Sequence, residues 1–277
     1  MTASFAFASL ESRALIAVSG PDWRSFLQGL LTQDVETLGP GEARFAALLT
    51  PQGRLLYDMF VVAWPDGMGV WLDVAAEHRA AIAFKLTLYR LRAKVEIAEA
   101  GELVAAAPAP GADGLWVADP RLPSLGFRGY GASVPAETQG EDAYEAHRMA
   151  LGVPGPADWG SDKAYPIEAD FDLLNGIDFK KGCFVGQETT SRMKRRGTLK
   201  NRMAPLEFDG PAPRPGAMLM AGELRAGEVL SGREGRAMAL VRLDRLDGDL
   251  SVEGRPVRVI FPEWLEDAAK LVEKPQG

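Results

Sequence analysis

The sequence predicts an α+β region over residues 1–199 followed by a small antiparallel β-barrel over residues 200–277. Through the first part, strand and helix patterns alternate along the chain. After Asn201 the helical pattern gives way to glycine, proline and short alternating apolar runs, which are typical of a small barrel. With 277 residues, 47% of them hydrophobic, the chain can bury more than one core.

The N-terminal elements are predicted from apolar spacing and turn residues. Two apolar runs within residues 5–18 are broken by a polar turn at 11–13 and predict a strand pair. Ser19 has the spacing of a helix N-cap, because Pro21 and Asp22 follow it at the first-turn positions. The apolar residues that would share one face of this helix are Trp23, Phe26, Leu27 and Leu30. Strands are expected over 43–49, 55–64 and 69–74.

The middle and C-terminal elements follow in the same way. A helix is predicted over about 77–89, a strand over 94–97, and irregular chain over 107–140 around a short strand at 115–117. A further helix over 142–151 ends at Gly152, with prolines beyond it. The barrel strands are expected near residues 218–220, 228–230, 237–242 and 257–261.

Composition excludes several classes of protein. The net charge of −7 argues against general nucleic-acid binding. No apolar run approaches the roughly 20 residues that span a bilayer, so no membrane partner is expected. The N-terminus shows neither a secretory signal nor a transit peptide, and a single cysteine forms no intramolecular disulfide. These features predict a cytoplasmic protein. The two histidines, His78 and His147, stand in no nucleophile motif.

The most distinctive segment is KKGCFVGQE, residues 180–188, which holds the only cysteine of the chain. Cys183 lies near Lys181 and between Gly182 and Gly186, which permit positive φ angles. A basic run over 192–196 follows. Cationic neighbours favour the thiolate form of a cysteine. The alternative interpretation, that Cys183 is an inert small apolar side chain, stays open.

This segment, continued to Arg192, resembles the signature of the YgfZ family of folate-binding proteins, which is related to the glycine cleavage T-protein, an aminomethyltransferase. Three further blocks resemble that family: FLQGLLTQDV at 26–35, TPQGR at 50–54 and YRLRAKV at 89–95. The resemblance implies a folate-binding α+β region of two interwoven subdomains followed by a C-terminal β-barrel. It also implies a tetrahydrofolate-binding accessory protein that supports iron–sulfur cluster assembly or repair in client enzymes, including tRNA-modifying ones.

The resemblance assigns roles to particular residues. Cys183 is the expected reactive thiolate, able to ligate iron transiently or to carry a sulfur adduct, and Lys181 is expected to favour that thiolate. Gln187 and Glu188 would orient the loop or contact the pterin, and Arg192 would bind the carboxylates of the folate tail. Tyr144 is expected to offer an aromatic face to the heterocycle, although an ordinary core tyrosine is nearly as well supported.

The chain departs from the T-protein at two places. Where the relatives carry a Gly-Gly turn and a paired Asp-Asp, this chain has Gly53 and Asp58 alone. Where they carry Arg-x-Glu-x-Gly, this chain has Arg148-Met149-Ala150-Leu151-Gly152, without the acid. Both losses weaken the case for aminomethyl transfer, because an N–H-rich ligand edge would lack its acceptor. A folate-dependent aminomethyltransferase or demethylase therefore stays the alternative to the accessory protein.

Overall fold

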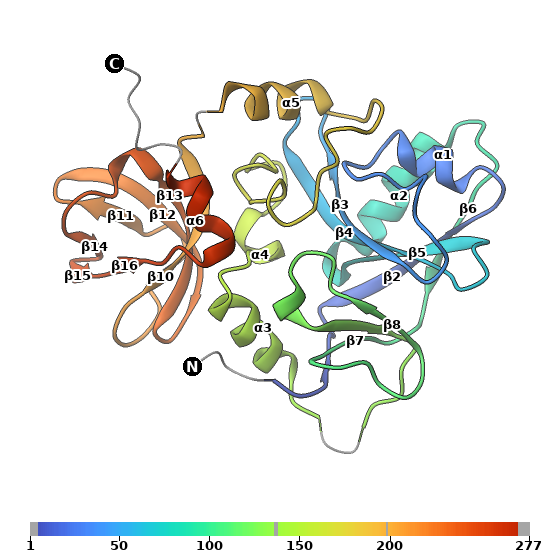
Figure 1. The fold of residues 1–277 in the computed structure, drawn as a ribbon, viewed down its shortest axis with the longest axis horizontal. Coiled ribbons are helices and arrows are strands. Elements are labelled where there is room, and N and C mark those ends of the chain that lie inside the picture. The colour runs from blue at the N-terminus through green and yellow to red at the C-terminus, as the bar shows by residue number, and fades with distance from the viewer. Residues whose placement is uncertain (1–4, 136–137, 198, 271–277) are drawn as a thin grey trace.

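The structure, a computed structural model, describes residues 5–135, 138–197 and 199–270. Two sheets and several helices form the larger part, and a strongly curved sheet forms the C-terminal part (Figure 1). This arrangement agrees with the predicted α+β region and barrel. In the described part of the chain, no helix is long and apolar enough to cross a membrane.

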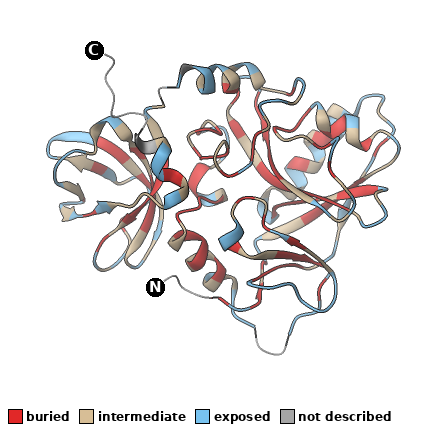
Figure 2. Cartoon of the chain, viewed as in Figure 1, coloured by how far each residue is buried: buried red, intermediate tan, exposed pale blue. Residues whose placement is uncertain are grey.

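A five-stranded antiparallel sheet forms the centre of the larger part. Its strands, in spatial order, are β3 (Ala43–Leu49), β4 (Leu55–Ala63), β5 (Gly69–Ala75), β2 (Arg13–Ser19) and β6 (Glu96–Ala100). Successive side chains point to opposite faces of a strand, so Leu15 enters one core and Ile16 the other. The core that contains Ile16 also includes Trp23 of α1 (Trp23–Gln28) and Leu86 of α2 (Arg79–Arg90). Figure 2 shows the buried stripes of this sheet.

A four-stranded sheet packs against the other face. Its strands, in spatial order, are β1 (Ala8–Ser9), β7 (Val104–Ala107), β9 (Phe127–Tyr130) and β8 (Leu115–Ala118). The predicted strand pair within 5–18 is therefore wrong, because β1 pairs with β7 whereas β2 pairs with β5 and β6. The turn at 11–12 carries the chain from one sheet to the other, so the two sheets are interwoven.

The helices differ from the predictions at their ends. Ser19 is the last residue of β2, and the N-cap of α1 is Asp22, whose carboxylate instead accepts the backbone N–H of Lys94 at 2.8 Å. The predicted helix over 77–89 begins with a short 3₁₀ turn, η1 (Ala76–His78), and continues as α2. The remaining helices of the larger part are η2 (Pro123–Leu125), α3 (Glu141–Ala150), α4 (Pro156–Trp159) and α5 (Gln187–Arg196).

The C-terminal sheet curls into a nearly closed antiparallel barrel. Its strands, in spatial order, are β15 (Arg255–Pro256), β14 (Leu250–Val252), β11 (Met218–Ala221), β12 (Leu224–Arg233), β13 (Arg236–Arg242), β10 (Asn201–Glu207) and β16 (Arg258–Val259). The turn η3 (Leu243–Arg245) and helix α6 (Glu263–Lys270) complete it. Its core contains Leu219, Val229 and Val241, and Leu265 of α6 packs against them.

Candidate functional site

Cys183 lies on an exposed loop that leads into α5. The thiol side chain is exposed, whereas the next residue, Phe184, is buried in the core between the two sheets. Gly186 is the N-cap of α5, and Glu188 lies in its first turn. The loop is therefore anchored by one aromatic side chain while it presents its thiol to solvent.

Lys181 fixes this loop to the N-terminal block of the chain. Its ammonium donates hydrogen bonds to the carbonyl oxygens of Gln28 at 2.8 Å, Leu31 at 2.7 Å and Gln33 at 2.9 Å. Burial lowers the pKa of Lys181 from 10.5 to about 8, against the opposing effect of nearby carboxylates. Three carbonyls occupy the three donors of its ammonium, so Lys181 holds the loop in place, and its effect on the thiol stays a prediction.

A second block of the sequence packs against the same loop through glycines. Gly53 has φ +84°, and a Cβ there would lie 2.8 Å from the Cβ of Thr189 in α5. Gly186 has φ +80°, and a Cβ there would lie 2.6 Å from the carbonyl oxygen of Thr50. Gly182 has no such constraint, and of the two glycines that permit positive φ angles here, Gly186 is the one that adopts such an angle. The blocks at 26–35 and 50–54 thus meet the cysteine segment, which explains three of the sequence blocks together.

The predicted contacts on α5 face solvent. The side chain of Glu188 is 92% exposed and lies 4.0 Å from the half-exposed guanidinium of Arg192. Gln187 reaches back to the carbonyl oxygen of Gly182 at a long 3.5 Å. We call the exposed set on this loop and helix the cysteine surface. Its members with side chains are Phe179, Lys180, Cys183, Glu188, Arg192, Lys194 and Arg195.

Tyr144 lies elsewhere, on α3, and the structure does not bring it to the cysteine surface (Figure 1). Its hydroxyl accepts hydrogen bonds from Arg121 at 2.7 Å and from Arg128 at 3.4 Å. The single folate site predicted from Tyr144 together with Gln187, Glu188 and Arg192 is therefore not formed. α3 packs beside β1 and β13, whereas α5 packs on the turn at 50–53, so the two groups stand on different parts of the fold.

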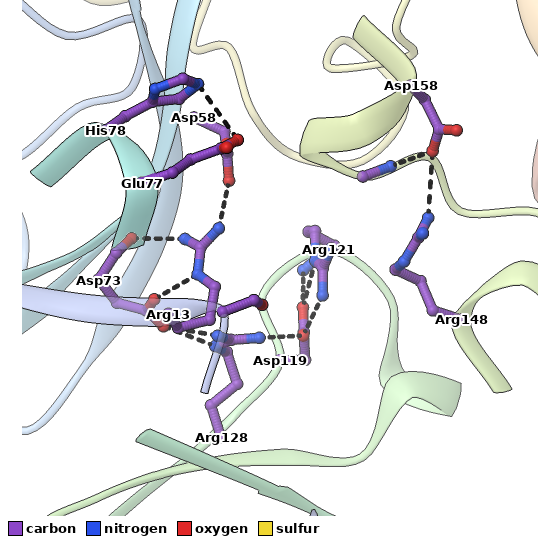
Figure 3. A network of polar contacts seen from close by, with 12 residues as sticks. Arg13, Asp58, Asp73, Glu77, His78, Asp119, Arg121, Arg128, Arg148 and Asp158 are labelled. Atoms are coloured by element: carbon purple, nitrogen blue, oxygen red, sulfur yellow. Dashed lines mark hydrogen bonds and ion pairs between the residues drawn. The ribbon is translucent and has the colours of Figure 1, made fainter. Parts of the chain in front are cut away.

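Around Tyr144, buried arginines and carboxylates form a network between the two sheets (Figure 3). Asp73 of β5 is fully buried, and its carboxylate accepts hydrogen bonds from Nε of Arg13 at 2.6 Å and from Nη2 of Arg128 at 2.6 Å. Burial alone would raise the pKa of Asp73, yet Arg128 and Arg13 hold it below its ordinary value. The hydroxyl of Tyr130 also donates to Asp73, at 3.0 Å.

The ring of Phe60 lies at the middle of these cations. The guanidinium of Arg128 stands 3.9 Å from the ring centroid, that of Arg121 4.9 Å and that of Arg13 5.5 Å. Cations over an aromatic face are attracted by its quadrupole, and the attraction grows when both are desolvated. The network therefore fills the space between the sheets with fixed charge, and the opening left beside Arg13, Asp58 and Tyr144 is only about 40 Å³.

A larger cavity of about 590 Å³ adjoins this network. The two spaces share Ser12, Glu145 and Arg148 in their linings. Arg148 is buried and bonds Glu145 at 2.6 Å and Asp158 at 3.4 Å. The acidic residues of the lining are Glu77, Glu141, Asp142 and Glu145. The cavity therefore favours a ligand edge rich in N–H donors and disfavours an anionic one.

Asp58, the single acid that matches the T-protein pair, lines the small adjoining opening of about 40 Å³ and not the larger cavity. Its Oδ2 accepts a hydrogen bond from Nη1 of Arg13 at 3.0 Å, and both side chains are almost fully buried. The Arg13 guanidinium therefore already occupies one oxygen of this carboxylate. Among residues 5–135, 138–197 and 199–270, no group of three His, Cys, Asp or Glu side chains is placed to hold a metal ion.

Sequence reasoning missed Arg13, Asp73, Arg121 and Arg128. The sequence pattern places Arg13 in a turn, and its partners Asp58 and Asp73 lie 45 and 60 residues away. Arg128 and Asp73 are 55 residues apart. Arg121 pairs with Asp119 only two residues away, but no motif marks that pair. The one available signal was charge inside otherwise apolar strands, as at Asp73 between Leu72 and Val74. Such a residue in a buried strand predicts a partner cation but does not name it.

Comparison with known proteins identifies the family. Residues 200–267 match the family description "CAF17, C-terminal beta-barrel domain". The chain is 30% identical over 311 residues to the iron-sulfur cluster assembly factor IBA57, mitochondrial, of Homo sapiens, with 97% of this chain and 87% of the relative covered. The chain belongs to this family of iron–sulfur cluster assembly factors. An IBA57 homolog of Neurospora crassa is 34% identical over 241 residues, covering 74% of this chain and 54% of that protein.

The fold has a close counterpart outside the family. The crystal structure of glycine cleavage system aminomethyltransferase T from Bartonella henselae matches with a TM-score of 0.76 over 96% of this chain and 88% of that one. At 17% identity this likeness concerns the fold alone. It confirms the predicted fold class, a T-protein-like α+β region followed by an antiparallel barrel.

The comparison contradicts the predicted cytoplasmic location. The IBA57 relatives of Neurospora crassa, mouse and human are all named as mitochondrial. The prediction rested on a single cysteine and on the absence of a recognisable N-terminal signal. A single free cysteine does not distinguish one reducing compartment from another, so that reasoning could not decide the location.

Proposed function

We propose that this protein assembles or repairs iron–sulfur clusters in client enzymes, with Cys183 supplying one thiolate to an iron or sulfur atom of the cargo. The exposed position of Cys183 on a doubly anchored loop is the observation that carries the proposal. A ligand that must receive and release its cargo has to be reachable by a partner, and the loop has to hold its shape when the cargo leaves.

The cluster would be shared with a second protein. Iron–sulfur clusters are commonly held by four thiolates, and this chain has one cysteine. A thiolate-bound cluster is anionic, so the exposed cations Lys180, Arg192 and Arg195 of the cysteine surface suit both the cargo and an acidic partner surface. In this proposal Lys181 positions the loop, whereas Glu188 and Arg192 face the partner and not a pterin.

We extend the proposal to tetrahydrofolate, whose pterin end suits the cavity of about 590 Å³. Its size lies within the usual range for small-molecule sites. The carboxylates of Glu141 and Glu145 would accept N–H groups of the pterin, and Tyr144 would lie at its inner end. The anionic glutamate tail would point away from these acids towards solvent. Bound there, folate would stabilise the junction of the two sheets and α3.

The alternative function is a folate-dependent aminomethyltransferase or demethylase. The fold and the position of Asp58 beside the cavity favour it. The ion pair between Arg13 and Asp58 counts against it, because the base would first have to lose its partner. We therefore keep the accessory role as the main proposal. We further propose that the protein belongs to the YgfZ branch of the family and that its clients include tRNA-modifying enzymes. We also propose that residues 1–199 and 200–277 form separate domains.

Cys183→Ser tests the proposal. The exposed side chain contributes little to packing, so the variant should keep the wild-type melting temperature and bind tetrahydrofolate equally in calorimetry. In cells that lack the protein, it should fail to restore the activity of iron–sulfur client enzymes. Gly182→Ala is the matched control, because a Cβ there meets no neighbour and the thiol remains. Full restoration by Cys183→Ser would move the assignment to the transferase.

A further inference from the structure

The outer face of α2 is apolar, although it faces solvent. Ala80, Phe84 and Thr87 follow one another at spacings of four and three residues, which places them on one side of the helix, and Leu91 is the residue that ends it. Leu88 lies beside them. The side chains of Phe84, Leu88 and Leu91 are 66%, 60% and 88% exposed. The opposite face, with Ile82 and Leu86, is already buried against the five-stranded sheet. A helix that is apolar on both faces is normally covered on both.

Cations flank this stripe, and acids are absent from it. Residues 79–95 contain no Asp or Glu, in a chain that has 38 of them. Lys85 lies on one side of the stripe and Arg90 on the other, and Arg92 and Lys94 follow its C-terminal end. Arg79 is the member of this segment paired with an acid, Glu99 of β6, at 2.8 Å. The segment therefore combines an apolar centre with a basic rim.

The end of the helix supports an outward role for Leu91. Its backbone has φ +46° and ψ −104°, in a region that favours glycine. Leu91 adopts this conformation although 88% of its side chain is exposed, so little packing within this chain offsets the cost of the conformation.

We propose that this face of α2 docks an acidic amphipathic helix of a partner protein. Phe84, Leu88 and Leu91 would provide the apolar anchors, and the small Ala80 and Ala81 would allow a close approach of the second helix. Acidic side chains on the partner would meet Lys85 and Arg90. The proposal rests on the proposed function in one respect: the partner is a client or an assembly protein of the cluster pathway.

Two other occupants fit less well. A second copy of this chain would bring Lys85 and Arg90 against the same cations, which disfavours a symmetric dimer. An anionic lipid surface would suit the basic rim, but a stripe that begins with two alanines buries little area in a bilayer. The spacing of four and three residues is that of a helix packed on a helix.

The test compares two double variants in cells that lack the protein, at limiting expression. Phe84→Ser with Leu88→Ser should lower the activity of an iron–sulfur client enzyme by about tenfold or more, the scale of losing two interface anchors. Arg90→Glu with Arg92→Glu should lower it in the same way. The control is Met218→Ser with Leu224→Ser, which removes two apolar side chains of similar exposure (54% and 61%) from the barrel and should leave activity unchanged.

Several results would overturn the inference. Wild-type client activity from Phe84→Ser with Leu88→Ser would show that the face binds no partner. Pelleting of the purified protein with vesicles of phosphatidylcholine and about 30% phosphatidylserine, lost in that variant, would assign the face to lipid. A dimer in sedimentation that depends on Phe84 would assign it to a second copy. These results can be told apart from a failure of the proposed function, because in that case the wild-type protein itself would not restore the activity of the client enzyme.

Discussion

Replacing Asp73 with Asn should destabilise the protein strongly, because it removes the central anion of the buried network. The Asp73 carboxylate receives hydrogen bonds from Arg13 and Arg128 at 2.6 Å each and one from Tyr130 at 3.0 Å. Asparagine keeps the shape of the side chain but not its charge. Two buried guanidinium groups would then share a neutral oxygen, and Asp58 and Asp119 would be their remaining anionic neighbours.

The size of the effect follows from burial. Breaking a buried ion pair by removing one partner costs about 3–5 kcal/mol, because the other charge stays desolvated. Asp73 is 0% exposed, so we expect the full range. For a protein of about this size each kcal/mol lowers the melting temperature by about 2–4 °C, which gives about 6–20 °C. Asp244→Asn, which breaks a surface pair with Arg242, should cost less than about 1 kcal/mol.

Urea denaturation at several pH values measures both variants. The pKa of Asp73 is lowered in the folded state, so its contribution is complete above the ordinary value of 3.8 and disappears as pH falls through the lowered pKa. The difference between wild type and Asp73→Asn should therefore be constant near neutral pH and shrink only below about pH 4. A difference under about 1 kcal/mol at pH 7 would refute a structural role for the network.

Two further predictions concern the loop that carries the thiol. Burial lowers the pKa of Lys181 to about 8, so between pH 8 and pH 10.5 the unfolded state binds more protons than the folded state. The stability of the wild type relative to Lys181→Met should therefore increase as pH rises through this window. A difference in stability that stays flat or falls would contradict the prediction. Gly186→Ala should expose the amides of 186–190 to faster hydrogen exchange and destabilise by about 1–3 kcal/mol, because its Cβ would lie 2.6 Å from the Thr50 carbonyl oxygen. Gly182→Ala should change neither quantity.

Most of the fold could be predicted because its signals are local. The strands over 43–49, 55–64 and 69–74 and the helices near 77–89 and 142–151 follow from apolar spacing and turn residues. The predictions that were wrong concern residues whose structure depends on contacts with distant parts of the chain. Ser19 has the right spacing for an N-cap, yet β5 and β6 hold it in a strand by pairing on both sides. The polar run over 187–196 has no apolar stripe, so its helix was not foreseen.

The candidate site shows the same limit. Cys183 could be singled out because it is the only cysteine and its neighbours form a specific motif, and the family comparison supports the pathway. The role of Lys181 could not be foreseen, since its partners are backbone carbonyls about 150 residues earlier in the chain. The separation of Tyr144 from α5 is likewise a result of topology, which residue type alone does not reveal.

The bonds of Lys181 also set the order in which the protein can be built. The ammonium joins residues separated by 148 to 153 positions, so the loop around Cys183 cannot take its shape on a nascent chain shorter than about two thirds of the whole. Contacts of such long range form late, because loop closure must precede them. During synthesis the thiol therefore stays unplaced until the α+β region has closed around residues 28–33. In the proposed function, the cargo therefore meets a fully shaped Cys183 loop only after this region has folded.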